Sequence, residues 1–238
     1  MINLTKSLLG VGSMTFISRV LGFLRDIIIA RIFGVGLATD AFFVAFKIPN
    51  LLRRISAEGA FTQAFIPILS EYKSKKTQKD TAILINKVAT FLGLFLIIVT
   101  TLGVLGAPWL IYISAPGFVS DPEKFNLTVE MLRITFPYIF FISLVSMAGG
   151  ILNSYGKFLV PAFTPVWLNI SFIVGALFFS DSFSQPVLVL AWAVFVGGAL
   201  QLFFQIPFLK QIGFLPKLDI NINDPGAVSY THLRAHET

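Results

Sequence analysis

The sequence contains no cysteine, so neither a disulfide bond nor a thiolate metal site can form. Histidine is nearly absent as well, because His232 and His236 are the only two and both lie in the last seven residues. A histidine-based metal or catalytic cluster is therefore excluded from the hydrophobic part of the chain. Charged residues are also scarce, at 13% of the chain against about 25% in soluble domains. We therefore expect no metal ion, no cofactor and no ordinary soluble fold.

What the chain does have is apolar sequence along almost its whole length. Hydrophobic residues make up 55% of the 238 residues, phenylalanine alone accounts for 26, and the mean hydropathy is +0.82. A membrane-spanning helix needs about 20 mainly apolar residues, and such runs recur here. The sequence predicts an all-α integral membrane protein. Its net charge of +6 then indicates membrane topology, and we expect no nucleic-acid partner.

The apolar runs and the turn residues between them predict six transmembrane helices, at about 8–33, 38–72, 82–113, 127–153, 158–180 and 186–209. The second is too long for a bilayer core at about 1.5 Å per residue, and Pro49 is expected to bend it. Residues 114–125 are expected to form an outer loop, and Gly197 and Gly198 to allow close helix packing.

Charge asymmetry predicts the orientation, because cytoplasmic loops are enriched in lysine and arginine. With both ends inside, the cytoplasmic lysines would be Lys6, Lys73, Lys75, Lys76, Lys79, Lys157, Lys210 and Lys217. The outer loops would carry mainly Asp121, Glu123 and Asp181. We therefore expect a multi-pass protein with a cytoplasmic N-terminus.

The predicted domain organisation has three parts. Residues 1–215 form the six-helix transmembrane lobe, and 216–227 form a polar cytoplasmic linker. Residues 228–238 end in SYTHLRAHET, which resembles a recurrent non-native tail on truncated open reading frames, the alternative being a native flexible tail. We exclude this segment from the expected fold.

The first two predicted helices carry eight charged residues despite their apolar character. They are Arg19, Arg25, Asp26, Asp40, Lys47, Arg53, Arg54 and Glu58. A charge facing lipid near the bilayer centre costs roughly 2.5 to 3.5 kcal/mol, so most of these side chains should face water or one another. Five positive and three negative charges would make such a cavity net cationic, which indicates an anionic cargo. Arginine's planar donor fork suits phosphate oxygens in particular.

The charges of helix 1 follow two helical stripes. Thr15, Arg19, Gly22 and Asp26 fall on one stripe, and Ser18 and Arg25 lie on the adjacent one. In the second helix, Asp40, Lys47 and Arg54 are spaced by seven residues, and Arg54 and Glu58 form an i,i+4 pair.

Three long runs resemble one known family. They are SMTFISRVLGFLRDIIIARIFG at 13–34, ATDAFFVAFKIPNLLRRISAEGAFTQAFIPILSEY at 38–72, and FPYIFFISLVSMAGGILNSYGKFLVPAFTPVWLN at 136–169. Together they resemble the MurJ/MviN family of bacterial lipid II flippases. The resemblance implies one six-helix lobe of a two-lobe, MurJ/MATE-like transporter of fourteen spans, with the sequence departing from the pattern after Pro225.

The resemblance also implies roles for single residues. Arg19, Arg25 and Arg53 would contact the diphosphate of the lipid-linked precursor, and Asp40 would belong to the central cavity. Asp26 and Glu58 would take part in polar pairs that open and close that cavity. Lys47 and Arg54 are interpreted as structural, because long cations near a kink can reach the membrane interface.

The implied function is transport and not enzyme catalysis. Two lobes that rock against each other would carry the lipid II head group across the bacterial cytoplasmic membrane by alternating access. The implied partners are lipid II and membrane lipids, and other cell-wall synthesis proteins are further candidates.

Three other functions compete with this one. A related polysaccharide-precursor flippase or multidrug exporter shares the fold class, although a cation exporter would need acidic cavity residues. A membrane enzyme acting on polyprenyl diphosphates would need clustered carboxylates, and the pair Asp121 and Glu123 is interpreted as solvated loop charge. A scaffold protein would need no buried arginine.

Overall fold

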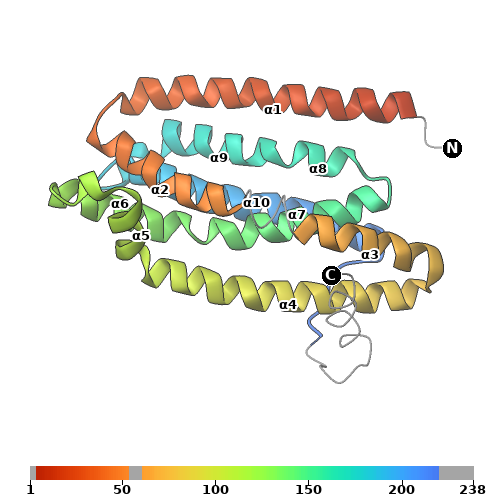
Figure 1. The fold of residues 1–238 in the computed structure, drawn as a ribbon. Coiled ribbons are helices and arrows are strands. Elements are labelled where there is room, and N and C mark those ends of the chain that lie inside the picture. Colours follow the sequence, from red (N-terminus) through yellow and green to blue (C-terminus); the bar gives the residue numbers. More distant parts are fainter. Residues whose placement is uncertain (1–3, 54–60, 220–238) are drawn as a thin grey trace.

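The computed structural model describes residues 4–53 and 61–219, and these ranges contain helices and no strand (Figure 1). The predicted all-α class is confirmed. In chain order the elements are α1 (Leu4–Phe33), α2 (Leu37–Arg53), α3 (Phe61–Lys75), α4 (Gln78–Leu105), α5 (Ala107–Ser114), η2 (Pro116–Phe118), α6 (Pro122–Thr135), α7 (Tyr138–Ser154), α8 (Leu159–Phe163), α9 (Pro165–Phe178), η3 (Ser180–Ser182) and α10 (Leu188–Gln211).

Four helical stretches in the described ranges are long and apolar enough to cross a membrane. They are Gln78–Leu105, Pro122–Ser154, Leu159–Phe178 and Leu188–Gln211. The chain is thus a multi-pass membrane protein. The count of six spans stays a prediction, because α1 and α2 are not among these four.

Several helices predicted as continuous are interrupted. The stretch expected at 82–113 begins at Gln78, where Thr77 and Asp80 form a reciprocal capping box, and it breaks at Gly106 between α4 and α5. The stretch expected at 127–153 starts earlier, at Pro122 in the predicted outer loop, and breaks between α6 and α7 at Pro137.

A further break divides the stretch expected at 158–180 into α8 and α9 at Thr164, just before Pro165. The reason is the same at both proline breaks: proline has no N–H group and its ring crowds the preceding turn, so the regular hydrogen-bond ladder stops there. By contrast, α10 matches the expected range 186–209 closely.

The second expected helix also differs from the prediction in part. Pro49 lies buried inside α2, and the helix continues past it to Arg53. Residues 54–60 lie outside the described ranges, so the predicted pair Arg54 and Glu58 does too. The chain is helical again in α3, which ends at Lys75 beyond the expected limit.

The helices pack around α10, which contacts α9, α7, α6 and α2. On one side α1 rests on α8 and α9, and on the opposite side α4 packs on α7 and α3 (Figure 1). Gly197 and Gly198 of α10 lie against Leu168 and Tyr138, and an added Cβ would crowd both neighbours. The predicted close packing at this glycine pair is therefore confirmed.

An aromatic cluster joins α2, α7 and α9 in the core. Phe42 stacks on Phe46 at 5.8 Å between ring centroids and meets Phe172 edge-on at 5.9 Å. Phe46 also approaches Tyr138 at 6.1 Å. Offset and edge-on arrangements of this kind are the favoured geometries of aromatic pairs. The cluster thereby fixes α9, and with it the helix face on which α1 rests.

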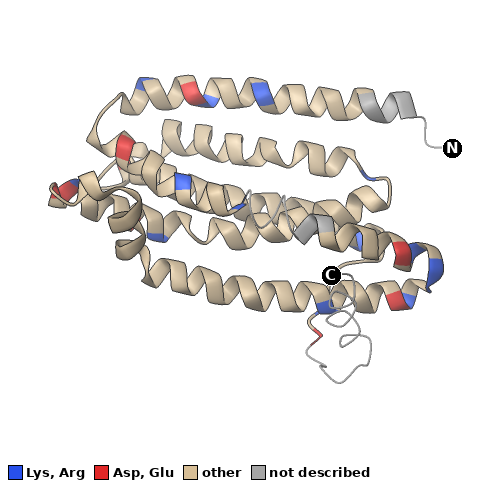
Figure 2. Ribbon diagram, in the orientation of Figure 1, with Lys and Arg blue, Asp and Glu red and all other residues tan. Residues whose placement is uncertain are grey.

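The turns divide between the two ends of the bundle (Figure 1). The α3–α4 turn, the α7–α8 turn and the end of α10 lie at one end, and the α1–α2 turn and the loops around η2 and η3 lie at the other. The lysines of the α3–α4 turn lie in the first group, and Asp121 and Asp181 lie in the second. Both ends of the bundle carry basic and acidic residues (Figure 2), so the sign of the charge does not distinguish them. Which end faces the cytoplasm stays a prediction.

The beginning of the predicted linker is anchored to α4. The backbone N–H of Lys217 donates to Asn86 Oδ1 at 2.9 Å, and that of Asp219 donates to Thr90 Oγ1 at 3.0 Å. Asn86 and Thr90 are one helical turn apart, so two successive acceptors hold an extended segment against the helix. The division into lobe, linker and tail otherwise stays a prediction, and residues 220–238 lie outside the described ranges.

Candidate functional site

The polar residues of α1 lie in two different environments. Ser18, Gly22 and Arg25 occupy the face that packs on α9, whereas Arg19 and Asp26 are exposed. Within the described ranges, Arg19 forms no hydrogen bond or ion pair. The stripe of Ser18 and Arg25 therefore contacts α9, as the helical period allows. The other predicted stripe divides, because Gly22 lies against α9 whereas Thr15, Arg19 and Asp26 are exposed.

Arg25 is held across the α1–α9 interface by a single asparagine. Its Nη1 donates to Asn169 Oδ1 at 3.0 Å, and Asn169 Nδ2 donates to the Ser18 carbonyl at 3.0 Å. Asn169 is only 6% exposed, so both ends of its amide are used in a buried setting. Gly22 lies beside this clamp, where an added Cβ would meet the Asn169 amide at an ordinary van der Waals distance of 3.8 Å. The clamp fixes where the guanidinium points.

The other donors of Arg25 meet its neighbour Asp26. Nε and Nη2 both donate to Asp26 Oδ1, at 2.9 and 2.8 Å. The Arg25 side chain is 26% exposed and that of Asp26 is 66% exposed, so the pair lies at the open edge of the interface. An exposed pair of this kind contributes little to stability. The pair does place a carboxylate against the Nε and Nη2 donors of the arginine.

The face of the Arg25 guanidinium lies over an aromatic ring. Its Cζ is 5.5 Å from the centroid of Phe172, which is buried in the aromatic cluster. A cation at this distance is attracted by the negative face of the ring. Arg25 is therefore oriented by three groups that hold different parts of one planar cation.

On α2, Asp40 pairs with a lysine that the sequence reasoning missed. Asp40 lies in the first turn, where a carboxylate is favoured by the helix dipole, and Lys124 Nζ of α6 donates to its Oδ2 at 2.9 Å. The Lys124 side chain is 18% exposed against 54% for Asp40, and its Nζ lies 4.2 Å from the centroid of Phe118. The pair ties the start of α2 to the start of α6.

Near the end of α2, Arg53 Nε donates to Asn50 Oδ1 at 3.0 Å. The two residues are three apart on one helix face, which is the spacing that brings side chains together. Lys47 is exposed on the same helix, and the predicted site residue Glu58 lies outside the described ranges.

The described contacts do not join the predicted site residues into one network. Arg25 and Asp26 lie at the α1–α9 edge, Asp40 at the α2–α6 contact, and Arg53 at the far end of α2. A cavity shared by Arg19, Arg25 and Arg53 stays a prediction. In the described part of the chain, no three carboxylates or histidines are grouped so as to hold a metal ion.

The comparisons with known proteins agree on one family. A family profile described as lipid II flippase MurJ matches residues 29–233. A Buchnera aphidicola protein named probable lipid II flippase MurJ is 50% identical over 224 residues, which cover 94% of this chain and 44% of that relative. The lipid II flippase MurJ of Burkholderia cenocepacia is 48% identical over 219 residues, which cover 92% of this chain and 42% of that relative.

A solved structure of lipid II flippase MurJ in an inward closed conformation shares the fold. Its TM-score is 0.72 at 31% sequence identity, over 89% of this chain and 43% of that one. The chain thus spans less than half the length of the relatives that it matches. Because the profile covers most of the sequence and the identities reach one half, the chain belongs to the lipid II flippase MurJ family.

Proposed function

We propose that this chain is the substrate-binding first lobe of a lipid II flippase in a bacterial inner membrane. The protein would move the undecaprenyl-diphosphate-linked precursor from the cytoplasmic to the outer leaflet. The observation that carries the proposal is the 50% identity over 94% of the chain to a relative named probable lipid II flippase. This activity is transport, and it needs no catalytic group.

The geometry of Arg25 supports a role in holding the diphosphate. Its Nε and Nη2 both donate to one oxygen of Asp26, at 2.9 and 2.8 Å. The same two N–H groups have the spacing and direction that suit a phosphate. Asn169 and Phe172 hold the rest of the group independently of Asp26. A phosphate oxygen could therefore replace the exposed carboxylate without reorienting the arginine. Asp26 would serve as the resident anion that substrate displaces.

The remaining predicted residues have parts in the same proposal. Arg19 and Arg53 would add two further cations for the diphosphate, and Arg19 is an exposed residue. Asp40 would act in gating through its ion pair with Lys124, because that pair joins α2 to α6. Glu58 would complete the gating set. We further propose a cytoplasmic N-terminus, rocking against a second lobe, and contacts with other cell-wall synthesis proteins.

The test is a chimera, since the chain covers only part of its relatives. Residues 1–219 would replace the matching segment of the Burkholderia cenocepacia relative, in cells depleted of their own flippase. Arg25→Ala should abolish growth support. Losing charge-assisted hydrogen bonds of about 1.5 to 3 kcal/mol lowers substrate binding by roughly tenfold to hundredfold.

The matched control is Arg31→Ala, which removes an exposed arginine from the last turn of the same helix. We expect Arg31→Ala to support growth, and both variants to reach the membrane in equal amounts. Arg25→Lys should fail as well, because an ammonium lacks the planar fork. Full growth with Arg25→Ala at normal protein level would refute the assignment of this residue. Failure of the unaltered chimera, expressed and inserted, would count against the lobe's function.

A further inference from the structure

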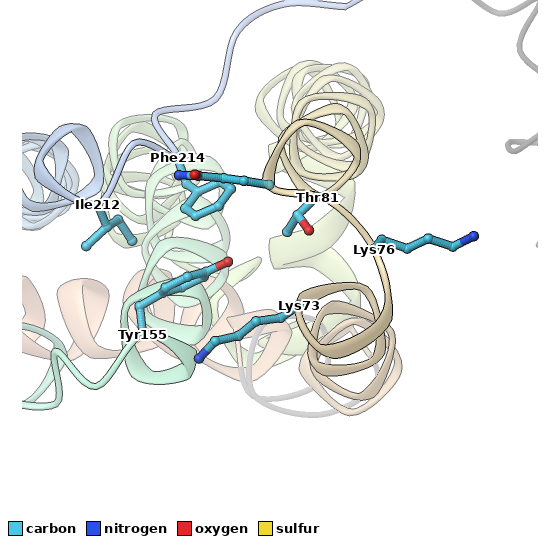
Figure 3. Close-up of a pocket in the computed structure, with 7 residues that line it drawn as sticks. Lys73, Lys76, Thr81, Tyr155, Ile212 and Phe214 are labelled. Carbon is cyan, nitrogen blue, oxygen red and sulfur yellow. The ribbon is translucent and has the colours of Figure 1, made fainter. Parts of the chain in front are cut away.

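A pocket of about 450 Å³ opens at the end of the bundle where the lysine-rich turn lies (Figure 3). Three separate turns build it: the α3–α4 turn, the segment after α7 and the segment after α10. The lining residues are Lys73, Lys76, Gln78, Thr81, Tyr155, Ile212 and Phe214. None of them belongs to the arginine-bearing faces of α1 and α2, so the pocket is a separate feature.

The lining is cationic, and the nearby carboxylates are already engaged. Lys73 and Lys76 line the pocket, and none of its described lining residues is acidic. Glu71 pairs with Lys75 at 3.1 Å, and Asp80 accepts the hydrogen bonds of the α4 cap. The positive charge of the lining is therefore not cancelled by a carboxylate inside the pocket.

Lys73 is held in place at the wall. Its Nζ donates to the Ser154 carbonyl and lies 4.5 Å from the centroid of Tyr155. One carbonyl uses one of the three donors of an ammonium group, so donors remain for a ligand. Lys76 also lines the pocket, and its side chain extends outward from the rim (Figure 3).

Tyr155 supplies a neutral donor. Its hydroxyl points into the pocket (Figure 3), and its ring packs against Phe214 at 4.7 Å between centroids. Burial raises the pKa of the Tyr155 hydroxyl above its usual range, so the group keeps its proton at neutral pH. Ile212 and Phe214 add apolar surface to the lining. Hydrogen-bond donors and apolar side chains therefore line one small space.

This combination fits a phosphate that carries an apolar or glycerol substituent. A phosphodiester has acceptor oxygens and a negative charge, and basic pockets between transmembrane helices bind anionic lipid head groups. The position agrees, because the pocket lies where helices predicted to cross the membrane end. We propose that this pocket binds the phosphate of an anionic phospholipid head group, with Lys73 and Tyr155 as its main donors.

The experiment uses the full 238-residue chain in detergent micelles with dioleoylphosphatidylglycerol as the probe and native mass spectrometry as the readout. Dioleoylphosphatidylcholine, which is zwitterionic, is the reference lipid. The double variant Lys73→Gln with Tyr155→Phe should bind phosphatidylglycerol about tenfold more weakly, the size expected for one lost charge-assisted hydrogen bond. Lys73→Arg should retain most of the binding.

The matched control replaces a lysine and a tyrosine outside the pocket, as Lys79→Gln with Tyr112→Phe, and should stay within twofold of the unaltered chain. Tyr155→Phe alone keeps the ring contacts, so it tests the hydroxyl if the double variant does not fold. Equal binding by the unaltered chain and either pocket variant would overturn the proposal. A second arm adds inorganic phosphate: strong competition by phosphate, with no preference for phosphatidylglycerol, would instead assign the site to a soluble anion.

Discussion

Asn169→Leu should loosen α1 from the rest of the bundle. Leucine is close to asparagine in size but has no amide, so the change removes both hydrogen bonds of the clamp and adds no polar group. The lost contacts are the 3.0 Å bond from Arg25 Nη1 and the 3.0 Å bond to the Ser18 carbonyl. Because α1 rests on α8 and α9, this buried amide is central to its attachment.

The size of the effect follows from the two bonds. Hydrogen bonds between transmembrane helices contribute about 0.6 kcal/mol on average and up to about 1.7 kcal/mol. Two of them give about 1 to 3 kcal/mol. Since each 1.4 kcal/mol is a factor of ten, the population with α1 detached from α9 should rise by about 5- to 150-fold.

Because the sequence contains no cysteine, spin labels can be attached at introduced cysteines without first removing native ones. Spin labels on Phe23→Cys of α1 and Leu177→Cys of α9, both exposed positions, report the separation of the two helices by electron resonance. Asn169→Leu should add a population at longer distance and lower the melting temperature. Asn153→Leu, at an exposed asparagine on α7, is the control and should change neither. An unchanged distance distribution in Asn169→Leu would refute the role of the clamp.

Two further predictions concern other contacts. Lys124→Ala and Asp40→Asn should each destabilise the chain slightly, because each breaks the ion pair between α2 and α6. A double-mutant cycle should give a coupling energy of about 0.5 to 1 kcal/mol between the two residues. Additive effects of the two substitutions would show that the pair is not formed. Gly103→Ala should lower the free energy of unfolding by about 1 to 3 kcal/mol, because the added Cβ would overlap the Phe136 ring. Gly93→Ala on the same helix is the control and should be neutral, because its Cβ meets nothing within 4 Å. Equal melting temperatures of the two variants would contradict this packing.

Some site features were local enough to predict. The polar stripe with Ser18 and Arg25 follows from the helical period, and the structure places both on the face toward α9. The helix breaks had local signals as well, since Pro137 and Pro165 stand where the hydrogen-bond ladder stops. Hydropathy nevertheless predicts one helix for each of those stretches, because the apolar pattern continues across a break that affects only the backbone.

By itself the sequence determined the all-α membrane class, the family resemblance and the charged character of the first two helices. Hydropathy, helical period and motif order are properties of neighbouring residues, so they can be read without a fold. Only the tertiary structure decided that Asn169, 144 positions from Arg25, orients that arginine, and that Lys124 is the partner of Asp40 across 84 positions. It also decided that three distant turns enclose one cationic pocket. The physical reason is that such contacts depend on which helix faces meet, and many packing arrangements share one local pattern.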